Sequence, residues 1–130
     1  MAFDQRHRKR GIRAAAVHPG GIHTELARHT GLSRLELMLK QINEQLASEG
    51  KPPFQWKTIS QGAATSVWTA VVASADEVAG RYCEDCHVAR VVADDVTVSP
   101  VSEGVRAYAL DPTTAEALWK KSEQMVGESF

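Results

Sequence analysis

Two short motifs contain residue types that could do chemistry. The first runs from Pro19 to Thr24, where a Pro-Gly turn lets the main chain approach a flat ring closely. Thr24 opens a stretch of helical pattern, so its hydroxyl stands beside free N–H groups and the positive end of the helix dipole, where a phosphate is stabilised. The other interpretation is an ordinary strand-to-helix turn capped by Thr24 or His23. On this motif alone, the ordinary turn is favoured.

The second motif is Cys83-Glu-Asp-Cys86-His87, which has the C-x-x-C-H spacing of covalent haem attachment. Such attachment normally requires export, and the N-terminal residues form a basic run instead of an apolar signal core. Zinc could use Cys83, Cys86 and His87 with His18 or His23, but one cysteine pair without a second is only half of a structural site. Thiols acting as small apolar residues are favoured, able to form a reversible disulfide if exposed. No metal site is expected, and a c-type haem protein is the minor alternative.

The composition is that of one ordinary globular domain. The 130 residues are 43% hydrophobic and 24% charged, and the formal net charge of −1 creates no field that favours nucleic acid or an anionic membrane. The basic run at residues 6–10 is interpreted as a solvated helix end. No stretch approaches the roughly 18 to 20 apolar residues of a membrane span. We therefore expect residues 1–130 to form a single cytoplasmic domain without nucleic-acid or membrane partners.

The first half of the chain is predicted to contain two helices and a strand. Residues 2–10 are compatible with a helix that ends at Gly11, and residues 12–17 suit a short strand covered on both faces. From 24 to about 48, apolar residues recur at three- and four-residue steps and predict a helix. Two prolines make residues 50–57 a turn. The apolar stripe of the helix is Leu32, Leu35, Met38, Leu39, Ile42 and Leu46.

The second half is predicted to complete a parallel pair of strands. Thr58 and Gln61 have the capping-box spacing, so a helix should begin at Thr58. A short strand after Gly80 would lie parallel to the first, because the helical segments between them form a crossover. Residues 88–107 show no sustained period and are predicted to be a loop. Asp111, followed by proline, should cap the last helix. The expected fold class is α/β, with two parallel strands and about four helices.

Taken in order, these segments resemble the C-terminal part of a short-chain dehydrogenase/reductase of the retinol-dehydrogenase-like branch. Residues 14–26, with their Pro-Gly-x-Ile-x-Thr pattern, resemble the strand and turn beside the nicotinamide. Residues 59–71 resemble the long helix before the final strand, 80–86 resemble that strand, and 108–127 resemble the closing helix. The resemblance covers almost the whole chain and implies the C-terminal part of a doubly wound, Rossmann-type fold.

The same resemblance implies a cofactor edge at the first motif. Pro19 and Gly20 would shape the turn, the backbone of Ile22 would meet the nicotinamide carboxamide, and Thr24 would offer its hydroxyl to carboxamide or phosphate. The implied cofactor is NAD or NADP, which this chain is not expected to bind tightly. The implied reaction is hydride transfer to or from an alcohol or carbonyl, with an apolar substrate expected.

The residues that would carry this reaction are absent from the 130. Gly20 and Gly21 do not have the GxGxxG spacing, and neither Tyr82 nor Tyr108 has a lysine four positions later. Without that tyrosine-lysine pair there is no agent for proton transfer, so we expect no catalytic residue and no activity from this chain alone. Translation of the DNA upstream of Met1 would show whether these motifs precede it. The uncovered faces instead predict a module that forms a homodimer or larger oligomer, or docks onto a full-length relative.

Overall fold

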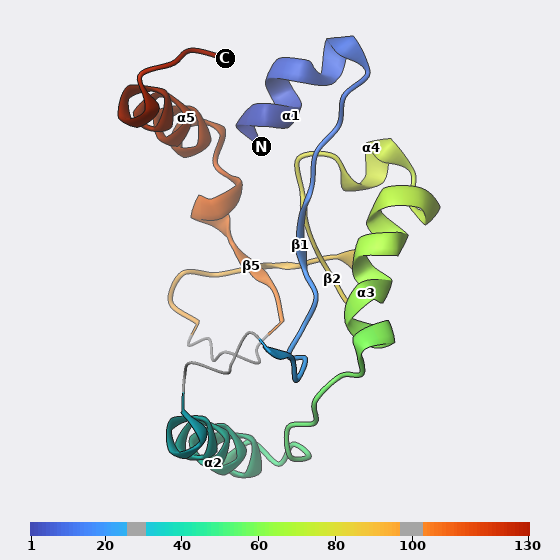
Figure 1. Ribbon diagram of the computed structural model, residues 1–130, viewed down its shortest axis with the longest axis vertical. Helices are drawn as coiled ribbons and strands as arrows, with labels where there is room; N and C mark the ends of the chain where they lie inside the picture. The colour runs from blue at the N-terminus through green and yellow to red at the C-terminus, as the bar shows by residue number, and fades with distance from the viewer. Residues whose placement is uncertain (26–30, 97–102) are drawn as a thin grey trace.

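Short strands with helices around them make up the chain (Figure 1), and the computed structural model describes residues 1–25, 31–96 and 103–130. The helical elements are α1 (Ala2–His7), η1 (Arg8–Arg10), α2 (Leu32–Ser48), α3 (Ile59–Val67), η3 (Trp68–Val72), α4 (Ala75–Val78), η4 (Ala107–Leu110) and α5 (Pro112–Val126). The strands are β1 (Ala16–His18), β2 (Tyr82–Glu84), β3 (His87–Val88), β4 (Val91–Val92) and β5 (Val105–Arg106).

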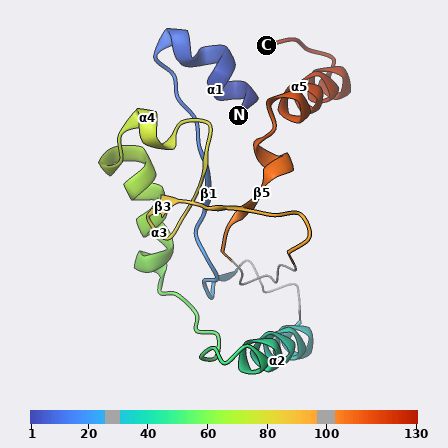
Figure 2. The ribbon, with the colours of Figure 1, turned by 180° about the vertical axis from the view of Figure 1, so that it is seen from behind.

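The central feature is the parallel pair of β1 and β2. Ala16 stands opposite Tyr82 and His18 opposite Glu84, while β3 runs antiparallel to β2 on its far side. The α3 helix lies along one side of this pair, and β5 and α5 lie on the other (Figures 1 and 2). This arrangement confirms the predicted α/β class with parallel strands and is a partial Rossmann-like fold.

The prediction of a plain loop over residues 88–107 was wrong. It contains β4 and β5, which pair in parallel, with Val91 opposite Val105 and Val92 opposite Arg106. Two-residue strands are too short to produce an alternating pattern, so sequence periodicity could not reveal them. Residues 97–102 of that stretch lie outside the described part of the chain.

The first helix and strand follow the prediction in position but not in burial. The helix predicted over residues 2–10 is present as α1 and η1, and it ends at Gly11, whose φ of 76° is left-handed. The strand was expected to be covered on both faces, yet Ala16 and His18 are exposed and Ile12 is 39% exposed. That expectation was wrong because Ala16 and His18 lie on the same face of β1, and the described elements do not cover that face.

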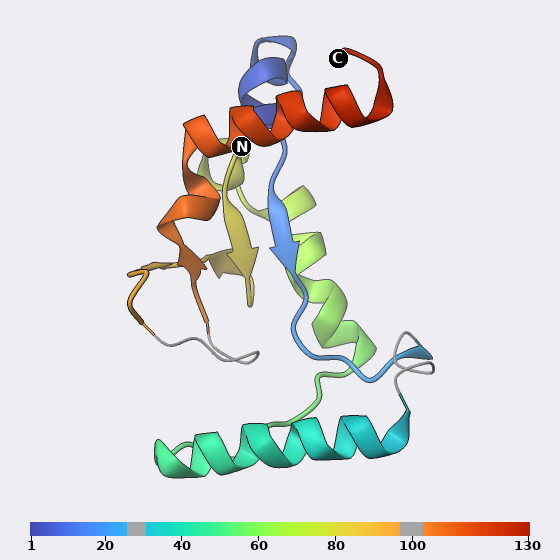
Figure 3. The same cartoon turned by 90° about the vertical axis from the view of Figure 1, so that its left-hand side faces the viewer.

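The α2 helix lies at one end of the molecule, as Figure 3 shows. It begins at Leu32, later than the predicted start at Thr24, and residues 26–30 lie outside the described part. Ile42 in the predicted stripe is buried at 6% exposure, whereas Met38 is 40% exposed. The amide N–H of Phe54 donates to Asn43 Oδ1 at 2.8 Å. This bond ties the predicted turn to α2 and brings Phe54 toward the loop that follows β1.

The α5 helix docks on α1 through one cation and two aromatic rings. Arg6 Nη2 lies 2.7 Å from Glu116 Oε1, and its guanidinium stands 4.9 Å from the centre of the Trp119 ring. Phe3 adds an aromatic contact to Trp119 at 6.2 Å between ring centroids. Trp119 is therefore a packing anchor between the two helices. Between these helices and the strands lies an apolar hollow of about 550 Å³.

The cap of α5 provides a first test of the fold. Asp111 Oδ1 accepts hydrogen bonds from the N–H groups of Thr113 at 2.7 Å and Thr114 at 3.4 Å. Asp111→Ala should lower the free energy of unfolding by about 1 kcal/mol, because these N–H groups lose their acceptor. Urea unfolding followed by circular dichroism measures the difference. Thr113→Ala keeps the cap and should change stability little, so equal losses in the two variants would contradict this account.

Candidate functional site

The predicted site lies at the carboxyl ends of β1 and β2. Because the two strands are parallel, the loop from Pro19 to Thr24 and the turn at Asp85 and Cys86 leave the sheet at the same edge. In open α/β sheets, ligands bind in the crevice outside the carboxyl ends of the strands. The fold therefore puts the first sequence motif where a ligand site belongs.

A hollow of about 280 Å³ opens at this edge. Its walls come from the exit of β1, from the α2 helix and from the turn after β2. Its described lining residues are His18, Gly20, Gly21, Met38, Leu39, Ile42, Phe54, Lys57, Glu84, Asp85 and Glu103. Of the predicted site residues, Gly20 lines the hollow, whereas Pro19, Ile22 and Thr24 do not.

The two glycines of the loop allow side chains from residues 54–57 to come very close. A Cβ on Gly20 would lie 2.7 Å from Lys57 Nζ, and a Cβ on Gly21 would lie 2.6 Å from Phe54 Cζ. Gly20 also has a φ of 86°, which residues with a side chain rarely adopt. The N–H of Lys57 donates to the Gly21 carbonyl at 2.9 Å, so the main chain at Lys57 holds the loop in place.

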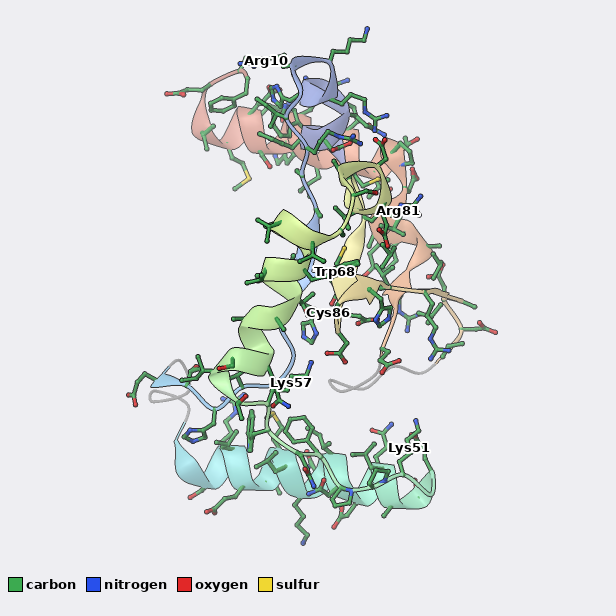
Figure 4. All side chains as sticks on the ribbon, turned by 90° about the vertical axis from the view of Figure 1, so that its right-hand side faces the viewer. Arg10, Lys51, Lys57, Trp68, Arg81 and Cys86 are labelled. Atoms are coloured by element: carbon green, nitrogen blue, oxygen red, sulfur yellow. The ribbon has the colours of Figure 1, made fainter. Side chains whose placement is uncertain are left out.

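Lys57 and Asp85 form an ion pair across the hollow. The sequence alone did not indicate either residue, because Lys57 stands in a proline-rich turn and Asp85 lies inside the C-x-x-C-H motif. Figure 4 shows Lys57 and Cys86 beside α3. Both Asp85 (φ 44°) and Cys86 (φ 58°) have left-handed backbones, a rare conformation for residues with side chains. Their backbone geometry is typical of the tight hairpin turn that joins β2 to β3.

Ile22 fixes the loop from behind. Ile22 forms an isolated parallel β-bridge with Lys57. On its other contact, a Cβ added to Gly62 of α3 would lie 2.5 Å from Ile22 Cγ1. The absence of a side chain at Gly62 therefore lets Ile22 pack directly on the helix. Helix α3 starts where the sequence predicted. The N–H of Gln61 donates to Thr58 Oγ1 at 3.2 Å, and the Gln61 Oε1 atom accepts from the N–H of Thr58 at 2.8 Å.

Pro19 and Thr24 are both exposed at the surface of the loop. The geometry thus brings Gly20 and Ile22 together with Lys57 but leaves the other two predicted residues at the rim. Whether these residues contact a cofactor stays a prediction. What sequence reasoning missed is the role of residues 54–57, which reach the loop from about 35 positions along the chain.

The two cysteines of the second motif have different environments. Cys83 is fully buried on β2, and its burial raises the pKa of the thiol above the ordinary value. Cys86 is exposed, and its N–H donates to Thr65 Oγ1 at 3.3 Å. Covalent haem attachment needs two accessible thiols, so the burial of Cys83 disfavours that alternative. Within the described ranges, no cluster of three or more His, Cys, Asp or Glu residues could hold a metal ion.

The pKa of Tyr82 is shifted away from the range in which a tyrosine acts as a general acid or base. Burial, and then the charge of Glu84, raise the pKa of its hydroxyl. A tyrosine that exchanges a proton near neutral pH needs a shift in the other direction. As for membranes, none of the helices in the described part of the chain has the length and apolar character needed to cross one.

Comparison with known proteins finds relatives that are named oxidoreductases or short-chain dehydrogenases. The chain is 42% identical over 113 residues to a probable oxidoreductase of Streptomyces lividans, which covers 85% of this chain and 35% of that protein. It is 33% identical over 111 residues to the short-chain dehydrogenase TIC 32 A, chloroplastic, of Brassica napus, covering 85% of this chain and 27% of that protein. With the short-chain dehydrogenase/reductase prx1 of Penicillium roqueforti the identity is 31% over 127 residues, 98% of this chain and 34% of that protein.

No family model and no solved structure matches the chain. The chain spans about a third of the length of the curated relatives it matches. Their names, together with the parallel strands and the loop at their carboxyl ends, agree with the family that the sequence motifs resembled. The chain is therefore similar, over about a third of their length, to oxidoreductases, two of which are short-chain dehydrogenases by name.

Proposed function

We propose that this chain forms one wall of the active site of an NAD(P)-dependent oxidoreductase that acts on an alcohol or carbonyl, and that the 130 residues alone do not turn over substrate. The observation that carries the proposal is the position of Gly20 and Gly21. They lie at the carboxyl ends of two parallel strands and line a hollow, while Ile22 holds the loop against α3. The relatives, being oxidoreductases by name, support the reaction class.

The described residues suit the nicotinamide end of such a cofactor but not its phosphates. Gly20 lines the hollow without a side chain of its own, and a flat ring could reach its main chain once the Lys57 side chain, which lies where a Cβ of Gly20 would be, moves aside. By contrast, Glu84, Asp85 and Glu103 line the hollow, and Lys57 is already paired with Asp85. A pyrophosphate would therefore meet carboxylates without a free cation among the described lining residues. The chain itself would contact the ring and leave the phosphates to other groups.

An apolar substrate is supported by the composition of the rest of the lining. Met38, Leu39 and Ile42 of α2 and the ring of Phe54 line the hollow together with the glycines. Apolar walls with a few polar groups are typical of small-molecule sites. We further propose that the parent enzyme belongs to the retinol-dehydrogenase-like branch. The resemblance of residues 108–127 to the closing helix of that branch supports this finer assignment.

Activity and ring contact can be measured on the same preparation. Purified chain of confirmed intact mass, mixed with NADH or NADPH and a series of apolar aldehydes, should leave the nicotinamide absorbance unchanged. Saturation-transfer NMR with nicotinamide mononucleotide should show signal on the ring protons. Sustained turnover would contradict the proposed inactivity.

Matched glycine variants test whether the loop makes the ring contact. Gly20→Val should abolish the ring signal, because the new side chain meets Lys57 and its backbone φ is 86°. Gly50→Val serves as control, since Gly50 also has a positive φ, of 68°, but open space around its Cβ position. A signal that survives in Gly20→Val, or disappears equally in both, would contradict the proposed wall.

A second candidate function is an interaction module, which would bind another copy of the chain or a full-length relative. Large apolar side chains favour it, because several stand outside any core. Ile59, Val71 and Met125 are each 76% exposed. A chain of this size rarely leaves so much apolar surface in water without a partner.

A further inference from the structure

The Lys57 side chain lies where a nicotinamide ring would dock on the proposed wall. A Cβ built on Gly20 would lie 2.7 Å from Lys57 Nζ and 2.8 Å from its Cδ and Cε atoms. The alkyl stem of Lys57 therefore covers the main chain of Gly20, which is the part of the wall that a flat ring needs to reach. Both residues line the hollow of about 280 Å³ at the carboxyl ends of β1 and β2. The protein's own side chain thus takes up the place of the ring.

Asp85, the ion-pair partner of Lys57, stands on a fixed turn. Its backbone is left-handed, with a φ of 44°, in the hairpin between β2 and β3. The N–H of the next residue, Cys86, donates at 3.3 Å to Oγ1 of Thr65, which is 1% exposed on α3. The turn is thereby tied to the helix, so Asp85 is a stationary anchor for the lysine.

The main chain of Lys57 is held as well, which leaves the side chain as the part that can move. The Lys57 N–H donates to the Gly21 carbonyl at 2.9 Å, and the residue forms a parallel bridge with Ile22. Thr58, which follows it, caps α3. A lysine side chain is a flexible four-carbon stem that ends in a compact charge. Rotation of this stem uncovers Gly20 without any shift of the loop or the helix.

The ion pair is weak enough for a small ligand to break. The Lys57 side chain is 28% exposed and that of Asp85 is 48% exposed, so water can solvate both charges when they separate. Partly exposed pairs of this kind change an equilibrium by no more than about fivefold. The pair can therefore hold the stem over Gly20 and still yield to a ring.

We propose that the Lys57–Asp85 ion pair is a latch over the ring-binding wall, and that a nicotinamide ring docks on Gly20 by displacing the Lys57 side chain. The proposal rests on the proposed function, because it names how access to that wall is controlled. The closed latch and the bound ring are competing states, so the latch lowers the affinity of the wall for the ring. Removal of either partner of the ion pair should raise that affinity.

Neutral nicotinamide is the probe, because an uncharged ring does not itself respond to the charge lost in the variants. Titration followed by NMR should give a dissociation constant about fivefold lower for Lys57→Ala than for the native chain. Asp85→Asn should lower it by a similar or smaller factor, since asparagine tolerates the left-handed backbone and the amine is released. Lys57→Ala combined with Asp85→Asn should bind no tighter than Lys57→Ala, because the two side chains act as one unit.

Lys51→Ala is the matched control. Lys51 also forms an ion pair, with Glu49, but it is not among the described residues that line the hollow. Figure 4 shows the two lysines on separate parts of the chain. This variant loses the same charge as Lys57→Ala, so its dissociation constant for nicotinamide should equal the native value.

Acetylation of the lysine amines measures the latch without a ring. With the hydroxysuccinimide ester of acetic acid and mass spectrometry of the peptides, Lys57 should react up to about fivefold faster in Asp85→Asn than in the native chain, because the released amine is open to the reagent. Saturating nicotinamide should likewise accelerate the reaction at Lys57 in the native chain, since the ring displaces the stem. The rate at Lys51 should stay the same throughout.

The outcomes separate the latch from the wall on which it rests. If nicotinamide binds the native chain and all variants equally, the wall stands and the latch is overturned. If Lys57→Ala weakens binding, Lys57 is a ligand contact and not a latch. If Asp85→Asn leaves acetylation of Lys57 unchanged, the ion pair does not hold the side chain, whatever the ring does. If nicotinamide binds none of the proteins, the wall itself is wrong, and the latch falls with it because no ring displaces Lys57.

Discussion

Replacing Asp4 with asparagine is expected to lower the free energy of unfolding by about 2 to 3 kcal/mol, a large share of the stability of a small domain. The Asp4 side chain is fully buried and accepts three hydrogen bonds. They come from Arg8 Nη2 at 2.9 Å, Arg13 Nε at 3.1 Å and the N–H of Ala14 at 3.1 Å. Asparagine removes the charge and one acceptor. The loss falls below that of a fully buried ion pair because the Arg8 side chain is 52% exposed and can regain water.

The same carboxylate makes stability depend on pH. Burial raises the pKa of Asp4, but the hydrogen bonds from Ala14, Arg13 and Arg8 outweigh it and hold the pKa below its ordinary value. A lowered folded pKa means that the contribution is complete above the ordinary aspartate pKa of about 4 and is lost as the pH falls through the folded value. The stability difference between the native chain and Asp4→Asn should therefore shrink as the pH drops from 7 toward 2 to 3.

Urea titrations of both proteins at several pH values measure this difference. Asp76→Asn is the matched control, because Asp76 also pairs with Arg13, at 2.9 Å, but its side chain is 95% exposed. An exposed ion pair contributes at most about 1 kcal/mol, so this variant should remain close to the native chain. A loss for Asp76→Asn as large as that for Asp4→Asn, or a difference for Asp4→Asn that does not change with pH, would contradict this account.

Local signals in the sequence were enough to place one end of each of three helical segments. Gly11, Thr58 and Asp111 act on backbone groups within four residues of themselves, so their effect can be derived without knowing the rest of the fold. The parallel pair of strands was also predictable, because a helical crossover leaves few other arrangements. That residues 1–130 form a single domain stays a prediction.

Contacts between distant segments were not predictable from spacing. Lys57 meets Asp85 across 28 positions, and Ile22 packs on Gly62 across 40, so neither pair leaves a periodic pattern in the sequence. The exposure of β1 was missed for a different reason. An apolar run predicts that a strand is buried. Which element packs on it depends on the fold as a whole and cannot be derived from the run itself. The candidate site was therefore located by its loop, and the rest of its lining came from the structure.

Gly62→Leu should give the second large effect, through packing instead of charge. Gly62 is buried on the inner face of α3, and even a Cβ there would lie 2.5 Å from Ile22 Cγ1. A leucine must push Ile22 and its loop away from the helix, which should cost about 3 kcal/mol, the upper end of the usual penalty for overpacking. The shift also moves the backbone of Gly20 and Gly21, so the nicotinamide ring signal should disappear with the lost stability.

Ala63→Leu separates this clash from any general effect of a larger residue on α3. Ala63 is the next residue of the same helix and is exposed, so its change in stability should stay within about 0.5 kcal/mol. In Gly62→Leu, helix propensity acts in the opposite direction. Leucine favours the helix over glycine by roughly 0.8 kcal/mol, which reduces the predicted loss of stability. The loss measured for Gly62→Leu is therefore smaller than the cost of the clash with Ile22 by about that amount. If Gly62→Leu is as stable as Ala63→Leu, Ile22 does not pack on α3, and the loop is held by Lys57 without it.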